Sequence, residues 1–439
     1  MKKTSWLLLP VLPLLLLFAF PHEPSDQNGY LGDAIQHLSE TSEKEPLSFS
    51  PVLSWDKDVE AVVYEIEFFG DYPQNLNPLQ PSPAAIFRSR EIYTNQYNPP
   101  LERFAANQLG KAPLYWRIRS LDINGQPIAP FSELAILYTS ASMPRMDAPI
   151  ALQPKGAAPL LYPVYDWVRP YDAARFELQL FQTNPEKHPD AEPIDTIFSD
   201  TAEIYDQTPR YGNHAFFWRV RALDAAGNQL GNWSRPARFK TSPKDNWEVA
   251  VFGDSISHGG GHISFSPSDP EFSWLSYLEF PAINLSFSGD TTENMLQRFD
   301  QDVLPFHPQY LLIFNGSNSL RGGVPAESVI TDFVELKERC LANGIKPIFL
   351  TLPPINPINI QRAFDEPTVD DWQVQFLLVN NYLRTQVHID TAAAFQQNTL
   401  LPTKYALDGL HEDVQGKKLI AAAVNAGWAK AKAAADARY

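Results

Sequence analysis

The chain has 439 residues, too many for one typical domain, and this length indicates two or three domains. Hydrophobic residues make up 44% of the sequence, which is ample for buried cores, and the formal net charge is -16. This acidic balance argues against nucleic acid as a partner and against electrostatic docking to anionic lipid.

Residues 1–21 have the features of an export signal, because two lysines precede an apolar run from Trp6 to Phe20. The run is short for a membrane span and its end lacks the small residues of a good cleavage site, so a cleaved signal peptide and an uncleaved N-terminal anchor both stay open. The sole cysteine, Cys340, leaves no intrachain disulfide, no cysteine zinc site and no lipid anchor at this signal. We expect an exported protein, in the periplasm, outside the cell or on its surface, with membrane contact only through an uncleaved segment 1–21.

Residues 22–45 are polar and predict a linker that leads into an internal repeat. The pattern over 115–125 recurs over 217–227, and in both copies apolar and charged residues alternate before an Asp-x-x-Gly turn. Alternation with a period of two predicts a half-buried strand. Partner strands with matching patterns lie upstream in each copy, at 64–68 and 176–180.

The two copies predict two all-β immunoglobulin-like sandwiches, over 46–141 and 148–242. Trp55 and Trp167, placed early in the copies, and the strands that follow them resemble fibronectin type III domains. The 39 prolines fit exposed loops and edge strands better than helix interiors. Three other tryptophans, for which sugar stacking is the alternative, are interpreted as packing residues: Trp116, Trp218 and Trp233.

From residue 246 to residue 435, segments typical of strands and of helices alternate. Near-continuous apolar strands between helices predict a parallel sheet covered on both faces, an α/β three-layer fold of the flavodoxin-like type. In such a sheet, ligands bind beyond the carboxyl ends of the strands. The expected strands are 249–252, 282–287, 310–314, 347–352 and 387–390, and the expected helices are 292–299, 326–343, 372–384 and 414–432.

Polar residues that suit a serine acyl hydrolase follow the first of these strands and precede the last helix. Ser255 follows an apolar strand in Gly253-Asp254-Ser255, a sharp turn that lifts a hydroxyl out of the sheet. A serine hydroxyl is a weak nucleophile at neutral pH, so it needs a positioned base, and an imidazole needs an acceptor that fixes its tautomer. His411 and Asp408, in Asp408-Gly409-Leu410-His411, fit these two roles.

Four short blocks in chain order resemble the GDSL family, also called SGNH hydrolases. The residues concerned are Ser255, Gly289, Asn318 and the pair Asp408 and His411. The resemblance implies an oxyanion hole made of the backbone N–H groups of Ser255 and Gly289 and the side-chain amide of Asn318, which stabilise the tetrahedral intermediate. The third block departs from the usual Gly-x-Asn-Asp, because Ser319 stands where the family has a carboxylate.

These features predict an exported serine esterase that works through an acyl-enzyme intermediate. Export and tandem β-domains suit a polymer substrate, and GDSL enzymes similar to this chain often deacetylate polysaccharides. We therefore favour a carbohydrate O-acetylesterase, acting on an acylated small molecule or an acetylated polysaccharide. The alternatives are a lipase, lysophospholipase or thioesterase for longer acyl chains, and a binding or adhesion protein with an inactive hydrolase domain. No pattern indicates a metal ion or an organic cofactor.

Two further segments lie close to the predicted site. His258 and His262 flank the glycine run 259–261, which we interpret as a flexible loop on the substrate side, with a metal site as the alternative. No Lys-Ser or Lys-Thr follows the run, so it does not match a phosphate-binding loop. Residues 353–357 read Pro-Pro-Ile-Asn-Pro and predict a rigid loop near the pocket rim.

Overall fold

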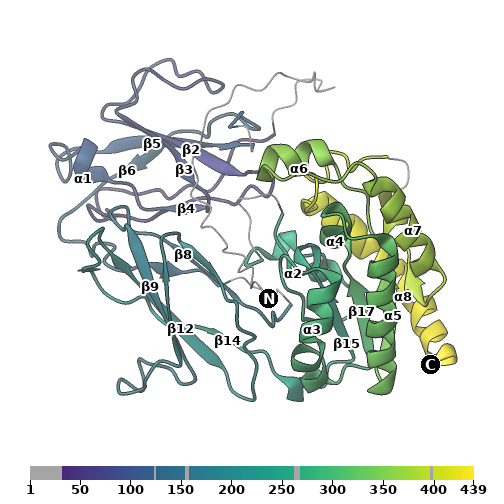
Figure 1. Cartoon of the computed structure of the whole chain (residues 1–439). Helices are drawn as coiled ribbons and strands as arrows, with labels where there is room; N and C mark the ends of the chain where they lie inside the picture. The colour runs from purple at the N-terminus through teal and green to yellow at the C-terminus, as the bar shows by residue number, and fades with distance from the viewer. Residues whose placement is uncertain (1–31, 123–124, 154–157, 262–266, 396–398) are drawn as a thin grey trace.

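The structure, a computed structural model, describes residues 32–122, 125–153, 158–261, 267–395 and 399–439 (Figure 1). The predicted export signal over 1–21 lies outside the described residues. Two β-rich units lie on one side of the molecule, and a sheet covered by helices lies on the other (Figure 1). Within the described ranges, no helix combines the length and the apolar character needed to cross a membrane.

The first β-rich unit contains the strands that the repeat predicts. Its elements are β1 (Leu53–Ser54), β2 (Val63–Phe69), β3 (Phe87–Ile92), β4 (Gln96–Tyr97), α1 (Leu101–Phe104), β5 (Leu114–Leu121) and β6 (Ala135–Leu137). Antiparallel pairing gives the order β3-β2-β5-β6, and β1 pairs with β4 in a separate small sheet. Leu53 of the small sheet and Ile66 and Trp116 of the larger sheet belong to the same buried core.

Residues 32–45, in the second half of the predicted linker, lie along this first unit. The side chain of Ile35 is buried in its core. The backbone N–H of Ser39 donates to the carbonyl oxygen of Ser54 at 2.8 Å. This segment is therefore packed against the fold although it forms no helix or strand.

The second β-rich unit repeats the arrangement. Its elements are β7 (Ile150–Ala151), β8 (Val164–Val168), β9 (Arg175–Phe181), β10 (Asp195–Ser199), β11 (Glu203–Tyr205), β12 (Phe216–Leu223), β13 (Gln229–Leu230) and β14 (Ala237–Phe239). One sheet has the order β10-β9-β12-β13, with β14 also paired to β12, and the other has the order β11-β8-β7. Trp167 of β8 packs in one core with Leu178 of β9 and Trp218 of β12.

The tryptophans of both units pack against protein groups. Trp116 and Trp218 are buried in the two cores. Trp233 is half-buried, and the guanidinium groups of Arg219 and Arg221 lie over its ring at 4.4 and 4.5 Å from the centroid. These contacts agree with the packing role that we inferred from the sequence.

The second half of the chain forms the expected parallel sheet with helices on both faces. Its strands are β15 (Val249–Gly253), β16 (Ile283–Asn284), β17 (Tyr310–Phe314), β18 (Lys346–Leu350) and β19 (His388–Ile389). Its α-helices are α2 (Ser255–His258), α3 (Thr292–Asp302), α4 (Ser317–Arg321), α5 (Ala326–Ala342), α6 (Pro357–Phe364), α7 (Trp372–Arg384) and α8 (Val414–Arg438). The strand order is β16-β15-β17-β18-β19, and all pairs are parallel.

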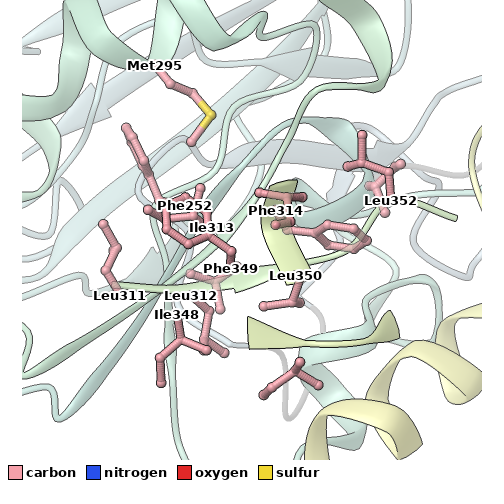
Figure 2. Close-up of a cluster of buried hydrophobic side chains, with 14 of the residues drawn as sticks. Phe252, Met295, Leu311, Leu312, Ile313, Phe314, Ile348, Phe349, Leu350 and Leu352 are labelled. Atoms are coloured by element: carbon pink, nitrogen blue, oxygen red, sulfur yellow. The ribbon is translucent and has the colours of Figure 1, made fainter. Parts of the chain in front are cut away.

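The core of this domain lies between the sheet and its helices. The strands β15 and β17 are buried along their whole length, as the near-continuous apolar pattern predicts. Figure 2 shows Phe252 of β15 and Ile313 and Phe314 of β17 among the apolar side chains of this core. The chain passes from β15 to β16 on one side of β15 and then to β17 on its other side. At such a change of side, the carboxyl ends of the two neighbouring strands, here β15 and β17, are the expected place for a ligand.

The predicted loop over 353–357 differs from the structure only at its last residue. Residues 353–356 form no helix or strand, and Pro357 is the first residue of α6. Proline suits this position since its fixed φ angle is helical and its missing N–H has no helical partner there. The side chain of Asn356 caps the helix by accepting a hydrogen bond from the backbone N–H of Asn359.

The second β-rich unit is hydrogen-bonded to the edge of the parallel sheet. Leu160 forms a parallel bridge with Asn284 of β16. The backbone N–H of Leu161 donates to the carbonyl oxygen of Asn284 at 2.9 Å, and the backbone N–H of Asn284 donates to that of Pro159 at 3.0 Å. Leu161 and Tyr162 also belong to the same buried core as β15 and β17. The segment 159–162 therefore extends the helix-covered sheet.

Candidate active site

Ser255 lies at the sharp turn between β15 and α2. At Gly253 a Cβ would lie 2.2 Å from the carbonyl oxygen of Phe314 on the neighbouring strand, so only glycine fits. The carboxylate of Asp254 caps α2 by accepting a hydrogen bond from the backbone N–H of Ile256 at 3.0 Å. This turn leaves the Ser255 side chain half-buried at the carboxyl edge of the sheet.

The three residues predicted as a triad meet in one hydrogen-bonded row. The Oγ atom of Ser255 lies 2.7 Å from Nε2 of His411, and Nδ1 of His411 lies 2.8 Å from Oδ2 of Asp408. The other carboxylate oxygen of Asp408 accepts the backbone N–H groups of Leu410 and His411, both at 2.8 Å. Because a carboxylate only accepts, Nδ1 of His411 carries the hydrogen and Nε2 is left to accept the serine proton.

Of the two other predicted donors, Gly289 lies on a loop next to the nucleophile turn and Asn318 lies in the short helix α4. The backbone N–H of Phe287 donates to the carbonyl oxygen of Gly253 at 3.0 Å, which holds the loop of Gly289 beside the nucleophile turn. Gly289 has a φ of +90°, a conformation that favours glycine. The side-chain amide of Asn318 donates to the carbonyl oxygen of Asp290 at 3.1 Å. An amide nitrogen has two hydrogens, so the second is available for a substrate oxygen.

Comparison with known protein families gives a match over the part of the chain that contains these site residues. Residues 251–419 match the GDSL-like Lipase/Acylhydrolase family. These residues form a GDSL-like lipase/acylhydrolase domain. The match includes every residue predicted for the triad and the oxyanion hole, and it leaves out both β-rich units. The GDSL domain thus supplies the ester-hydrolysing character of the chain.

Individual proteins resemble this chain only in part, with identities of 20–32%. The uncharacterized lipoprotein YqeF of Bacillus subtilis (strain 168) is 32% identical over 120 residues, which cover 25% of this chain and 49% of that protein. The chain thus matches about half the length of this curated relative. A GDSL-like lipase from Bacteroides thetaiotaomicron is 20% identical, with a TM-score of 0.34, and the match covers 43% of this chain and 90% of the lipase. An acetylxylan esterase from Geobacillus stearothermophilus is 21% identical, with a TM-score of 0.31, over 40% of this chain and 90% of the esterase.

The environment of His411 in the GDSL domain tunes its basicity. Burial by itself lowers the pKa of the imidazole, but the charge and hydrogen bond of Asp408 outweigh burial and raise the pKa above its ordinary value of 6.5. The ring of Phe364, at the end of α6, meets the imidazole edge to face with 5.8 Å between centroids. The imidazole of His411 therefore has an aromatic contact in addition to its hydrogen bonds with Asp408 and Ser255.

A buried charged pair lies behind the triad of the GDSL domain, and sequence reasoning did not find it. Lys417 and Glu412 are both fully buried, with 3.8 Å between Nζ and Oε2. Burial lowers the pKa of Lys417 and raises the pKa of Glu412. The Lys417 ammonium also donates to the carbonyl oxygen of Ile256 in α2 at 2.8 Å. This bond ties the helix that carries Ser255 to the start of α8, next to His411.

Ser319, which stands where the family has a carboxylate, makes a hydrogen bond to a helix N–H in the structure. Its buried hydroxyl accepts the backbone N–H of Thr292, in the first turn of α3, at 3.1 Å. A carboxylate is not required for this contact, because a hydroxyl oxygen also satisfies a helix N–H. Ser319 therefore holds α4, with Asn318 on it, against the start of α3.

Of the two histidines in the glycine-rich segment, only His258 is among the residues that the structure describes. His258 is buried, with Nδ1 at 2.8 Å from Oγ of Ser288 and Nε2 at 2.8 Å from the carbonyl oxygen of Tyr162. Both ring nitrogens therefore face protein groups. His262 lies outside the described residues. Across the described ranges, no cluster of three or more His, Cys, Asp or Glu side chains is placed to hold a metal ion.

We expect Asn318→Ala to lower kcat by about a hundredfold to a thousandfold, because losing one oxyanion donor typically has an effect of this size. The control is Asn315→Ala, since the buried Asn315 amide donates to the same Asp290 carbonyl oxygen at 3.1 Å. Steady-state hydrolysis of p-nitrophenyl acetate measures both variants. Equal effects of the two substitutions would show that Asn318 only supports the loop, which contradicts an oxyanion role.

Proposed function

We propose that this protein is an exported serine esterase that hydrolyses its substrate through an acyl-enzyme intermediate, and that it removes O-acetyl groups from carbohydrate. The observation that carries the esterase proposal is the hydrogen-bonded row of Ser255, His411 and Asp408, with distances of 2.7 and 2.8 Å. The GDSL domain match supports the same chemistry. In this proposal the catalytic residues are these three, and the oxyanion hole consists of Ser255, Gly289 and Asn318.

The proposed reaction has two halves. His411 takes the hydroxyl proton of Ser255 as the oxygen attacks the ester carbonyl, and the oxyanion hole receives the negative charge that develops on the carbonyl oxygen. The intermediate then collapses, the alcohol leaves with the proton from His411, and an acyl group remains on Ser255. Water attacks this acyl-enzyme with His411 again as base, which releases the acid and restores the serine.

We further propose that the β-rich units are two fibronectin type III-like sandwiches, over 46–141 and 148–242, followed by a hydrolase domain over 246–435. The paired sheets that share one core in each unit support this proposal. Packing of two sheets around one core is the architecture of such domains.

The proposed location is the cell envelope or the space outside it. The apolar run after two lysines within residues 1–21 supports export. The similarity to YqeF, a protein named as a lipoprotein, is compatible with an envelope location. Export and the accompanying β-rich units favour a polymer as the acetylated substrate.

We expect p-nitrophenyl acetate to give the highest kcat/KM in a series of p-nitrophenyl acetate, butyrate, octanoate and laurate. A pocket built for acetyl groups leaves no room for longer chains, whereas a lipase pocket gains affinity with each buried methylene. The Ser255→Ala variant provides the background of uncatalysed hydrolysis. An optimum at octanoate or laurate would replace the acetylesterase proposal by a lipase or lysophospholipase. Acetate release from acetylated glycans then tests the carbohydrate part.

A further inference from the structure

We propose that Tyr162, which lies just before β8 of the second β-rich unit, is a positioning residue for the GDSL domain. It holds two segments in register: the nucleophile turn, residues 253–255, and the oxyanion loop, residues 286–290. The β-rich unit is in this way a working part of the esterase. This inference rests on the proposed esterase function and goes beyond it, because Tyr162 lies outside the family match over residues 251–419.

Tyr162 is anchored where the two parts of the molecule join. The preceding residues, 159–161, pair with Asn284 at the edge of the sheet. The Tyr162 side chain is 5% exposed, and its ring lies 4.5 Å from the ring of Phe287 in the oxyanion loop. Backbone pairing on one side and ring packing on the other leave the Tyr162 backbone and hydroxyl little freedom.

A first link runs from the backbone of Tyr162 to the oxyanion loop. Its carbonyl oxygen accepts a hydrogen bond from Nε2 of His258 at 2.8 Å, and Nδ1 of His258 lies 2.8 Å from Oγ of Ser288. A carbonyl only accepts, so the hydrogen of a neutral His258 is on Nε2, and Nδ1 accepts the hydroxyl of Ser288. Burial lowers the pKa of His258 to about 4, which keeps the ring neutral at physiological pH. Ser288 directly precedes the proposed oxyanion donor Gly289.

A second link runs from the Tyr162 hydroxyl to both segments through one arginine. The hydroxyl donates to Oδ2 of the fully buried Asp302 at 2.6 Å, and Arg298 donates to the same oxygen at 2.9 Å. Arg298 also donates to the carbonyl oxygen of Leu285 at 2.7 Å and to that of Gly253 at 3.1 Å. The guanidinium group therefore joins the strand end before Ser255 to the strand end before the oxyanion loop.

The position of Arg298 depends on how its carboxylate partners are satisfied. Arg298 pairs with both Asp290 and Asp302, so two buried carboxylates share one cation. Within the described residues, Oδ2 of Asp302 receives hydrogen bonds from Tyr162 and Arg298 alone. Without the tyrosine hydroxyl, the unmet acceptor capacity of Asp302 pulls Arg298 away from the two carbonyl oxygens. A shift of the nucleophile turn relative to the oxyanion loop follows.

The test is Tyr162→Phe in the full chain, with Tyr165→Phe as matched control. Tyr165 also donates a buried hydroxyl to a carboxylate, Asp206, at 2.8 Å, but this contact lies inside the β-rich unit. We expect Tyr162→Phe to lower kcat for p-nitrophenyl acetate about tenfold with little change in KM, because small misplacements of reacting groups act on the transition state. Tyr165→Phe should keep the native kcat. Equal kcat values in the two variants would overturn the inference.

Two further measurements test the role of Tyr162 independently of the proposed esterase function. Ser288→Ala breaks the first link at a half-buried residue, and we expect it to lower kcat about tenfold as well. Hydrogen exchange should rise over residues 253–259 and 285–290 in Tyr162→Phe and stay native there in Tyr165→Phe. If the native protein hydrolyses no ester, the esterase proposal is wrong. The exchange result would still show whether Tyr162 holds the nucleophile turn and the oxyanion loop in place. Unchanged exchange in Tyr162→Phe refutes the link whatever the activity.

Discussion

Ser255→Ala will lower kcat by about a millionfold, and His411→Ala will lower it by nearly as much, because members of a triad act as a unit. The 2.7 Å contact between Ser255 Oγ and His411 Nε2 is the reason. Without the imidazole the hydroxyl keeps its proton, and without the hydroxyl the imidazole has no nucleophile to activate. The double variant should therefore be no slower than Ser255→Ala alone.

Rates on p-nitrophenyl acetate test this prediction, together with covalent labelling by a fluorophosphonate probe. The native protein should be labelled, and Ser255→Ala should not. Ser257→Ala is the matched control, because this serine lies on the same short helix but its hydroxyl accepts the Trp274 indole N–H at 3.3 Å. Absence of labelling in the native protein, or a double variant slower by the product of the single effects, contradicts a working triad.

The sequence predicted the parallel sheet and the meeting of its site residues for a physical reason. Apolar runs such as 310–314 have no polar face, so they belong in the middle of a covered sheet. Once the strands are parallel, the residues that follow β15 and β17 must lie at the same edge. Ser255 and Asn318 therefore lie at the same edge of the sheet, although no local signal in the sequence links them.

Other parts of the site have no local signature. The buried pair of Lys417 and Glu412 looks like ordinary surface charge in the sequence, because burial of a charge depends on the whole fold. Tyr162 precedes β8 in a segment that the sequence assigns to a β-domain, and only the pairing of 159–161 with Asn284 brings it to the GDSL domain. Contacts between domains depend on the folded surfaces of both partners, so neither hydrophobic periodicity nor a short sequence motif predicts them.

Each β-rich unit has side-chain contacts with the GDSL domain. Lys57 of the first unit pairs with Asp269 and Glu271, which follow the glycine-rich segment of the GDSL domain. Tyr162 of the second unit contacts the residues behind the nucleophile turn. Both units are therefore attached to the GDSL domain by side-chain contacts.

Asp408→Asn will lower kcat by about ten thousandfold, because it reverses the tautomer of His411. The oxygen Oδ1 of Asp408 accepts the backbone N–H groups of Leu410 and His411, both at 2.8 Å. In the variant, the amide oxygen must stay with these donors, so the amide NH₂ faces Nδ1 of His411. Nδ1 then accepts, the hydrogen moves to Nε2, and Nε2 no longer takes the proton of Ser255.

The same substitution also changes the pH dependence, which distinguishes loss of the tautomer from general damage. Asp408 raises the pKa of His411 above 6.5, and the base must be neutral, so native kcat/KM should rise with pH through a midpoint above 6.5. Burial and Lys417 lower this pKa, so without Asp408 the midpoint should move to lower pH. Asp390→Asn is the control, since that carboxylate pairs with Arg384 beyond β19, and it should leave rate and midpoint native. A less than tenfold loss with an unmoved midpoint would remove Asp408 from the triad, because a bystander carboxylate affects neither the tautomer nor the basicity of the imidazole.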